Sequence, residues 1–380
     1  MTELNRRDWL QQSAALTLTG GLLSAGALAA DPATVAKPAE AKPTGSPVPS
    51  GYGDVKQYAD AVFVDGSPPL PSEGSFTVAV LPDTQHYSQR YPDNFHKQTE
   101  WIADQVKARR ISAVLHLGDI TNRSTPEEWT VASAAMAKLD GKVPYFMVVG
   151  NHDYSADGRC VDRTTRYNDY FPVDRFRERP NFGGTYDKEP TRMENSYQTF
   201  AVGGRKFLVL SLEYGPRNDV IRWANEVVAK HADHEAILIT HAYMYYDETR
   251  YDWKKYGKNQ TWNPHGYAIS ANTNDDVNDG EEMWQKLVSK HENFILTLNG
   301  HVLNDGLGRL TSQTKAGRDV HQTLVNFQMK PNGGDGWLRL LEFKPDGRTL
   351  DVVDYSPILN RQNHSKQNKF ELRTSPVAKA

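Results

Sequence analysis

Six short runs of apolar residues dominate the hydrophobic pattern of the chain, and each run stops at a polar residue. The runs cover residues 76–81, 113–117, 145–149, 207–210, 236–240 and 294–298. Short runs rich in valine, isoleucine, leucine and phenylalanine are typical of buried β-strands. Residues 94–109 and 127–139 separate the first three runs and have helical character. Alternation of strands and helices predicts parallel strands joined by crossovers, and therefore an α/β fold.

The polar residues at the ends of five of these runs belong to only three chemical types. Asp83, Asp119 and Asn151 follow the first three runs, and His241 and His301 follow the last two. Ligands of parallel sheets bind beyond the carboxyl ends of the strands, so these five side chains are expected to meet at one edge. A glycine stands immediately before three of them, where it allows a tight turn. The pattern predicts a binding site at this edge.

The residue types predict which chemistry the site supports. Carboxylate oxygen, amide oxygen and neutral imidazole together suit divalent Mn, Fe or Zn, and the lack of thiolate ligands argues against a structural zinc site. A central carboxylate can bridge two ions about 3.5 to 4 Å apart, which activate a water and hold phosphoryl oxygens. His152 is followed by Asp153. An imidazole held by a carboxylate can protonate a departing alkoxide, so His152 is the candidate general acid.

The complete pattern resembles the signature of calcineurin-like metallophosphoesterases. It consists of Asp83, Gly118-Asp119, Gly150-Asn151-His152-Asp153, His241 and Gly300-His301, spread over about 220 residues. Residues 81–85, 118–122 and 334–339 are similar to an exported bacterial branch of that superfamily. The resemblance implies a four-layer αββα sandwich of two mixed sheets flanked by helices. It also implies hydrolysis of a phosphodiester or a phosphomonoester by a metal-bound hydroxide.

The resemblance also implies a role for each matching residue. Asp119 would bridge two divalent metal ions. Asn151, His241 and His301 would complete one metal site, and Asp83 would begin the other. His152, with Asp153 behind it, would lie near the leaving group as general acid.

Two positions depart from the superfamily pattern, and both concern the same metal ion. Gln85 replaces the histidine of the Asp-x-His motif, and Leu303 replaces the second histidine of the Gly-His-x-His motif. An amide oxygen is a weaker ligand than imidazole, and leucine offers none. The first metal site is therefore expected to bind weakly or to be empty, unless another residue replaces the lost ligands. Glu213, His86 and Asn304 are candidates for that role, or else turn and supporting residues.

Three further features bear on the substrate. Residues 243–267 are rich in tyrosine and tryptophan and follow His241 directly, so they form either a wall over the site or an aromatic core under a long loop. Residues 333–336, Gly-Gly-Asp-Gly, could approach a phosphate, although a β-hairpin turn is the favoured interpretation. Arg217 and Arg222 are weak candidates for phosphate contacts. The substrate-binding residues are therefore not identified by the sequence.

Composition limits the classes of partner. The net charge is −3 over 380 residues, with no basic stripe, so a stable nucleic-acid complex is not expected. The expected partner is a small phosphate ester such as a nucleotide or a sugar phosphate. Cys160 is the only cysteine, which excludes an intrachain disulfide.

The N-terminal residues predict export. Arg6-Arg7 is followed by an apolar run rich in small residues that ends near Ala30, which fits a twin-arginine signal peptide over 1–30. The predicted organisation continues with a flexible linker over 31–50, a catalytic domain over 51–359 and a polar C-terminal tail over 360–380. The mature protein would be periplasmic or secreted, without membrane attachment after signal cleavage.

Other functions stay open at this point. Gln85 and Leu303 fit a catalytically degraded metal- or ligand-binding protein on the same fold, although a binding protein has no need of the His152–Asp153 pair. A mononuclear metallohydrolase that uses only the intact site is another possibility. A carbohydrate-binding module is suggested by the aromatic insertion alone.

Overall fold

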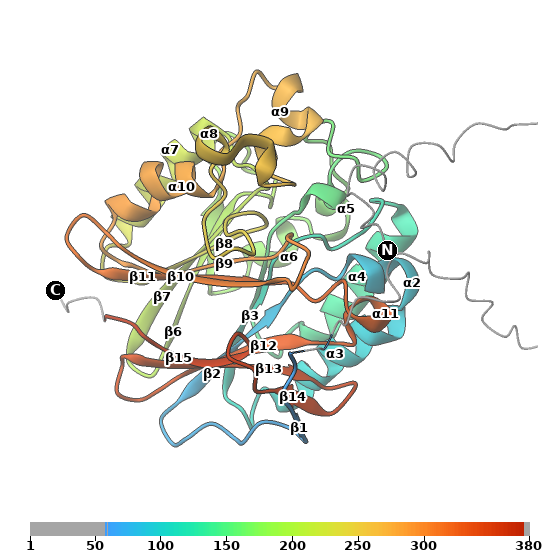
Figure 1. Cartoon of the computed structure of the whole chain (residues 1–380), viewed down its shortest axis with the longest axis vertical. Helices are drawn as coiled ribbons and strands as arrows, with labels where there is room; N and C mark the ends of the chain where they lie inside the picture. The colour runs from blue at the N-terminus through green and yellow to red at the C-terminus, as the bar shows by residue number, and fades with distance from the viewer. Residues whose placement is uncertain (1–57, 59, 376–380) are drawn as a thin grey trace, which may run out of the picture. The chain divides into compact units, whose positions relative to one another are not determined.

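The computed structural model describes residue 58 and residues 60–375, and these form two mixed β-sheets flanked by helices (Figure 1). The predicted signal peptide and linker lie outside the described residues. Within these residues, one sheet has eight strands in the order β1-β14-β13-β12-β2-β3-β4, with β15 also paired to β13. Its strands are β1 (Phe63–Asp65), β2 (Phe76–Leu81), β3 (Ile111–His116), β4 (Tyr145–Met147), β12 (Leu338–Phe343), β13 (Thr349–Ser356), β14 (Arg361–Asn363) and β15 (Lys369–Arg373).

The second sheet has seven strands within the described part of the chain, in the order β10-β11-β9-β8-β7-β6-β5. They are β5 (Phe182–Thr185), β6 (Ser196–Val202), β7 (Arg205–Leu212), β8 (Glu235–Thr240), β9 (Phe294–Asn299), β10 (Leu307–Gln313) and β11 (Asp319–Val325). The strands β2, β3 and β4 of the first sheet are parallel, as are β7, β8, β9 and β11 of the second. Antiparallel strands extend both sheets, which makes both of them mixed.

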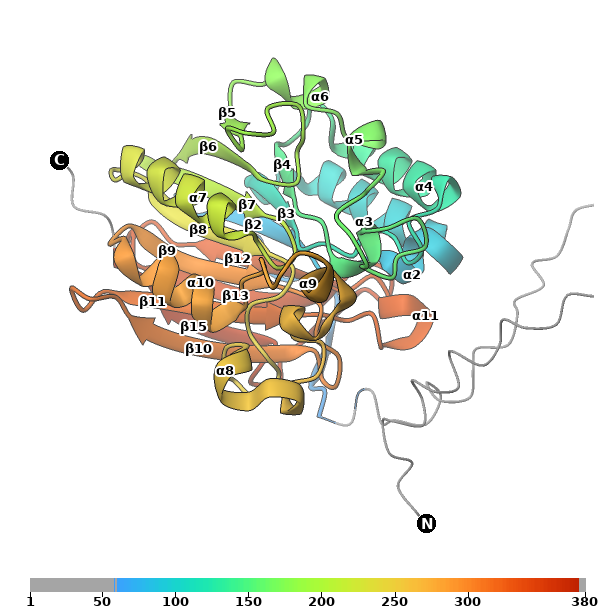
Figure 2. The same cartoon turned by 90° about the horizontal axis from the view of Figure 1, so that it is seen from above.

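Helices cover the outer faces of both sheets (Figure 2). The α-helices are α2 (Gln85–Arg90), α3 (Pro92–Gln105), α4 (Pro126–Met136), α5 (Tyr167–Tyr170), α6 (Asp174–Arg177), α7 (Asn218–Lys230), α8 (Trp253–Tyr256), α9 (Ala268–Asn272), α10 (Gly280–Lys286) and α11 (Pro331–Gly334). Single 3₁₀ turns are η1 (Ala137–Leu139), η2 (Asn151–Asp153), η3 (Gly257–Asn259), η4 (Pro264–Gly266) and η5 (Val288–Lys290). Among the described residues, no helix combines the length and apolar character needed to cross a lipid bilayer.

The apolar core lies in two layers because side chains alternate across each strand. Val78 and Val80 belong to the core between the sheets, whereas Ala79 and Leu81 belong to the core beneath the helices. The ring of Phe207 on β7 joins the two sheets, with its centroid 5.6 Å from that of Phe76. A strand buried on both faces reads as a continuous apolar run, which is why the sequence pattern located these strands. The predicted four-layer α/β architecture is confirmed.

Two expectations about local structure are wrong. The predicted polar tail contains β14 and β15, which pair with β13 in the first sheet. Phe370 and Leu372 of β15 alternate with charged residues and pack against the core between the sheets. This period-two pattern is that of a half-buried edge strand, although the segment is polar overall.

Residues 333–336 do not form a β-hairpin turn. They lie at the end of α11 and just after it, on the connection from β11 in one sheet to β12 in the other. Gly334 passes so close to Tyr87 that a Cβ atom there would lie 2.5 Å from the tyrosine hydroxyl, and Gly336 N donates to the same hydroxyl at 2.8 Å. The glycines therefore permit a close packing between α11 and α2.

Candidate metal centre

The ends of strands from both sheets bring the predicted site residues to one place. Asp119, beyond β3, and His241 and His301, beyond β8 and β9, have ligand atoms that all lie within 4.8 Å of one another. All three side chains are buried. Asp119 and His301 have φ angles of 46° and 75°, an unfavourable left-handed conformation for residues other than glycine. Such strain is found where the surrounding structure holds a functional side chain in position.

Two glycines make room for the carboxylates of the site. A Cβ atom on Gly150 would lie 2.1 Å from Oδ1 of Asp119, and one on Gly300 would lie 2.0 Å from Oδ1 of Asp83. Any side chain at either position would collide with a carboxylate. The glycines before Asn151 and His301 therefore allow the backbone to approach these carboxylates closely, in addition to allowing a tight turn.

Backbone carbonyl groups fix the orientation of both histidines. Nδ1 of His241 lies 2.7 Å from the carbonyl oxygen of Leu117, and Nε2 of His301 lies 2.8 Å from that of Trp262. A nitrogen that donates to a carbonyl carries the proton, so the lone pair of each neutral ring lies on the other nitrogen. For His241 that nitrogen is Nε2, which lies 3.1 Å from Oδ1 of Asp119. This is the arrangement by which proteins orient metal-binding imidazoles.

The charged groups of the site shift one another's pKa values. Burial lowers the pKa of His241, but Asp119 and Asp83 outweigh it and raise that pKa to about 9. Burial, and then the charge of His241, lower the pKa of His301 to about 3. Burial would raise the pKa of Asp119, yet His241 and His152 bring it well below its usual range. The centre thus holds an anionic carboxylate next to one neutral and one charged imidazole, and a bound cation would replace the proton on His241.

Several buried polar atoms of the site have no hydrogen-bond partner. They are Oε1 of Gln85, Oδ1 of Asn151, Nδ1 of His86 and Nε2 of His241, whose approach to Asp119 lacks hydrogen-bond geometry. Leaving a buried polar atom unpaired costs about 1–3 kcal/mol. The amide oxygens and Nδ1 of His86 offer lone pairs, and Nε2 of His241 offers one once a cation replaces its proton. Amide oxygen and imidazole nitrogen are ligands of divalent cations. The unpaired atoms therefore fit a metal centre.

Asp83 is buried near this group but is held by other contacts. Its oxygens accept hydrogen bonds from the backbone N of His301, at 3.1 Å, and from Nδ2 of Asn326, at 3.0 Å. Burial raises its pKa to about 8, opposed by His241 and supported by Asp119. Asn326 was not predicted as a site residue. It directly follows β11, but polar residues interrupt that run, so the rule for apolar runs does not identify it.

The structure separates the three candidates for a replacement ligand. Glu213 is engaged elsewhere, since Arg217 donates to it from Nε at 2.8 Å and Arg163 lies 3.4 Å away. Asn304 is exposed. His86 is largely buried, and its pKa is lowered to about 4 by burial, then by the charges of Arg90 and His152, with Asp119 opposing. His86 is thus the one of the three that lies within the electrostatic reach of the centre.

His152 has a different partner from the one predicted. Its backbone N donates to Oδ1 of Asp119 at 3.0 Å, and its Nδ1 lies 2.9 Å from the carbonyl oxygen of Asn122. The ring is therefore oriented by a backbone carbonyl rather than by Asp153. A backbone acceptor has no sequence signal, which is why this contact could not be predicted. With Nδ1 engaged, Nε2 is the atom available for proton transfer.

Asp153 instead organises the loops that carry the site. Its carboxylate accepts from the backbone N of Gly150 at 2.8 Å, of Ile120 at 3.1 Å and of Thr121 at 2.8 Å, and from the hydroxyl of Thr121 at 2.8 Å. Burial and the nearby Asp119 raise the pKa of Asp153 to about 7, and the backbone donors oppose this rise. The residue fixes the loop after β3 against the turn after β4.

Replacing Asp153 with asparagine should lower the free energy of unfolding by about 1–3 kcal/mol, because the amide NH₂ would face backbone N–H donors and leave them without an acceptor. Urea denaturation of the metal-free protein measures this loss. The exposed Asp104→Asn on α3 is the matched control and should change stability by less than about 0.5 kcal/mol. Equal stability of the two variants would contradict the assigned role.

The aromatic insertion after His241 contacts the centre and also builds its own core. Tyr243, Tyr245 and Tyr251 are buried, which supports the interpretation as an aromatic core. The carbonyl of Trp262 holds His301, and the ring of Tyr267 lies 6.1 Å from that of His301, so the same segment forms one wall of the centre. The insertion is therefore an aromatic core at Tyr243, Tyr245 and Tyr251, and a wall of the centre at Trp262 and Tyr267.

His265 ties the insertion to the residues around α10. Its Nδ1 lies 2.6 Å from Asp275 and its Nε2 lies 2.8 Å from Glu282. Burial lowers the pKa of His265, but these two carboxylates raise it to about 9. A raised histidine pKa stabilises the fold fully below the unfolded value of about 6.5, and this contribution is lost as pH rises through about 9.

We expect His265→Gln to melt at a lower temperature than the unmodified protein when thermal unfolding is followed from pH 6 to pH 10. The difference in melting temperature should be largest near pH 6. The difference should shrink as pH rises toward 10. A difference that stays constant across this range would show that the imidazole does not act through its charge.

Arg217 and Arg222 are committed to carboxylates. Arg217 binds Glu189 and Glu213, and Arg222 binds Asp187, Asp219 and Glu226. These ion pairs occupy the guanidinium groups of both arginines. The suggestion that they clamp a phosphate is not supported by these contacts.

Comparison with known proteins gives one family. Residues 76–330 match the family described as calcineurin-like phosphoesterase. The Uncharacterized protein YvnB of Bacillus subtilis (strain 168) is 30% identical over 306 residues, which cover 77% of this chain. This chain spans only 21% of the length of that relative.

Several solved structures are similar to this chain. The purple acid phosphatase PPD1 from yellow lupin (Lupinus luteus) seeds has a TM-score of 0.43 at 13% identity, covering 81% of this chain and 55% of that one. GAP50, the anchor in the inner membrane complex of Plasmodium, has a TM-score of 0.42 at 9% identity, covering 79% and 89%. A 5'-nucleotidase precursor from Thermus thermophilus has a TM-score of 0.39 at 12% identity, covering 79% and 55%.

Proposed function

Because the chain belongs to the calcineurin-like phosphoesterase family, we propose that it is a metal-dependent hydrolase of phosphate esters. The observation that carries the proposal is the compact group of Asp119, His241 and His301, together with the buried, unpaired amide oxygens of Gln85 and Asn151. These are the lone pairs that a divalent cation would use. Buried polar atoms are usually paired in folded proteins, and a cation bound here would satisfy these.

Different residues would bind the metal ions, transfer the proton and position the loops. Asp119, Asn151, His241 and His301 would hold the better-formed metal site, and Asp83, Gln85 and His86 would contribute to the other. When bound, divalent ions of the Mn, Fe or Zn type would lower the pKa of a water molecule and neutralise phosphoryl oxygens. His152 delivers a proton from Nε2 to the leaving oxygen, while the Asn122 carbonyl keeps its ring in place. Asp153 acts as a positioning residue through the backbone that it holds.

A mononuclear hydrolase is the second candidate, and one observation favours it. Asp83 is bound by Asn326 and by the backbone of His301, and it lies outside the compact group. Together with Gln85 and Leu303, this weakens the first site. Metal content at full activity separates the two forms, since one tightly held ion per chain supports the mononuclear enzyme and two ions support the dinuclear one.

The experiment compares turnover of 4-nitrophenyl phosphate with bis(4-nitrophenyl) phosphate by the manganese-loaded full chain. Turnover is expected for at least one ester, with loss on EDTA treatment and recovery on adding manganese back. The preferred ester identifies the substrate as a monoester or a diester. A folded, metal-loaded protein without turnover on these or alkyl esters would instead support a binding protein on a degraded enzyme scaffold.

Export by the twin-arginine pathway is also proposed, on the basis of Arg6-Arg7 and the apolar run behind it. Changing both arginines to lysine should leave the protein inside the cell, as measured by fractionation of a bacterial host. Unchanged export of the double variant would refute this route.

A further inference from the structure

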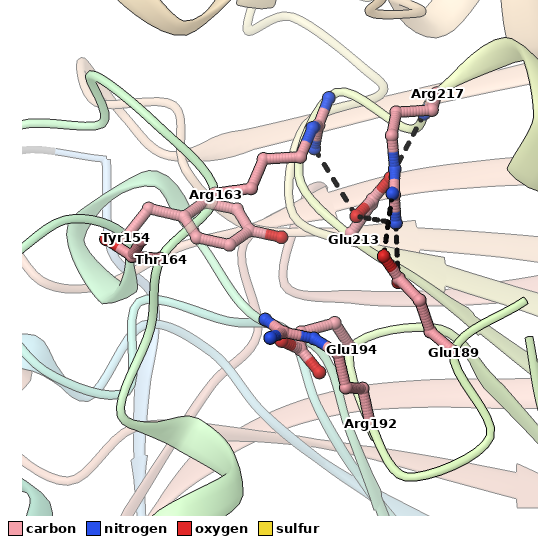
Figure 3. A pocket seen from close by; sticks show the side chains of 8 residues that line it. All are labelled: Tyr154, Arg163, Thr164, Glu189, Arg192, Glu194, Glu213 and Arg217. Atoms are coloured by element: carbon pink, nitrogen blue, oxygen red, sulfur yellow. Dashed lines mark hydrogen bonds and ion pairs between the residues drawn. The ribbon is translucent and has the colours of Figure 1, made fainter.

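A polar pocket lies beside the metal centre and takes no part in the function proposed so far. It has a volume of about 190 Å³ and is lined by three arginines, three glutamates, a threonine and Tyr154 (Figure 3). Tyr154 directly follows the turn η2 that carries Asn151 and His152. Glu213 directly follows β7, whose last residue is paired with Thr240, the residue before His241. The pocket and the centre thus share two segments of chain.

The charges in this pocket balance. Arg217 donates to Glu189 from both terminal nitrogens, at 2.8 and 2.7 Å, and from Nε to Glu213 at 2.8 Å. Arg192 pairs with Glu194, and Arg163 lies 3.4 Å from Glu213. Three positive groups therefore face three negative ones. The pocket has no net charge with which to attract an ion.

Two donors in the pocket are left without partners. The hydroxyl of Tyr154 is buried, with the side chain only 1% exposed, and it makes no hydrogen bond of normal geometry, although Arg163 lies close to it. In Figure 3 this hydroxyl points into the space between Arg163, Glu213 and Glu194. Nε of Arg163 is also buried and unpaired, while its terminal nitrogens donate to the backbone carbonyls of Tyr214 and Gly215. An oxygen atom of a ligand or of an ordered water would satisfy unpaired buried donors of this kind.

We propose that this pocket binds an uncharged polyol, namely the sugar or other polyhydroxyl part of the phosphate ester. Each hydroxyl of such a ligand both donates and accepts, which matches a lining of N–H donors interleaved with carboxylate acceptors. The proposal rests on the proposed hydrolase function, because it assigns the alcohol side of the same substrate.

Charge and size both select this class of ligand. An anion would be placed against Glu194 and Glu213, and a cation against the arginines, so neither would regain the free energy of its lost hydration. A cavity of about 150 Å³ accommodates a benzene ring. A pocket of about 190 Å³ therefore has room for one ring with its substituents.

Tyr154→Phe is the discriminating variant, because it removes only the unpaired hydroxyl. Binding of D-ribose and D-glucose to the full chain is measured by saturation-transfer NMR, with cyclohexanol and acetate as probes of an apolar ring and an anion. The sugars should bind, and their dissociation constants should rise about tenfold in Tyr154→Phe, as expected for one lost hydrogen bond. Tyr170→Phe, which removes a hydroxyl bonded to Pro126 outside the pocket, should bind as the unmodified protein does.

A second measurement needs no variant. Hydrogen exchange of the unmodified protein should slow in residues 154–164 and 213–217 when a sugar is added. The proposal would be overturned if the sugars do not bind, if acetate binds more tightly than the sugars, or if Tyr154→Phe binds the sugars as tightly as the unmodified protein does. Ester turnover without sugar binding would reject the pocket alone, whereas sugar binding without any turnover would reject the hydrolase and leave the pocket standing.

Discussion

Replacing Asp119 with asparagine should lower turnover of phosphate esters at least about 10³-fold. Mutating a residue that only orients a metal ligand typically lowers metal affinity or activity about 10–100-fold. Losing a central ligand should lower activity by more than that. Asparagine keeps the shape of the side chain and an oxygen that can still accept from the backbone N of His152, now 3.0 Å from Oδ1. It removes the negative charge that faces His241 and His301, and therefore the attraction for a divalent cation.

Turnover and metal content of the same preparation are the two readouts for this variant. Asp104→Asn, which removes the same charge from an exposed position on α3, should behave as the unmodified protein in both. An Asp119→Asn protein that keeps its metal and most of its activity would show that the centre lies elsewhere.

His152→Gln should reduce turnover by about 10²–10⁴-fold for an alkyl phosphate, whose alkoxide needs a proton to depart. The loss should be far smaller for 4-nitrophenyl phosphate, because nitrophenolate departs without protonation. This difference arises only if His152 acts on the leaving group. Its Nδ1 is engaged by the Asn122 carbonyl, so Nε2 is the atom that would deliver the proton.

Metal content separates this role from a structural one, since His152→Gln should bind as much metal as the unmodified protein. His234→Gln, which alters a histidine paired with Asp233 before β8, is the matched control and should leave both substrates unaffected. An equal loss for the alkyl and the nitrophenyl ester would argue that His152 supports the centre and does not protonate the leaving group.

The sequence predicted the strands of the site well because of a geometric rule. Carboxyl ends of parallel strands meet at one edge, so polar residues after apolar runs are brought together. Asp119, His241 and His301 obey this rule, and so does Asn326, which was missed because its run is interrupted by polar residues.

Contacts set by tertiary packing had no comparable signal. The partner of His152 is a backbone carbonyl, and Glu213 is drawn away from the centre by Arg163 and Arg217. Arg163 is 50 residues distant from Glu213 in the chain, so its approach depends on how the loop after η2 folds back. The strand β15 did have a signal, in the alternation of Phe370 and Leu372 with charged residues, but polar composition concealed it.

Anomalous diffraction from crystals of the manganese-loaded protein tests the central claim most directly. We expect a peak among Asp119, Oδ1 of Asn151, Nε2 of His241 and Nδ1 of His301, with any second peak weaker and on the side of Asp83 and Gln85. A crystal of active, loaded protein with no peak at this position, or with its strongest peak elsewhere, would contradict the account.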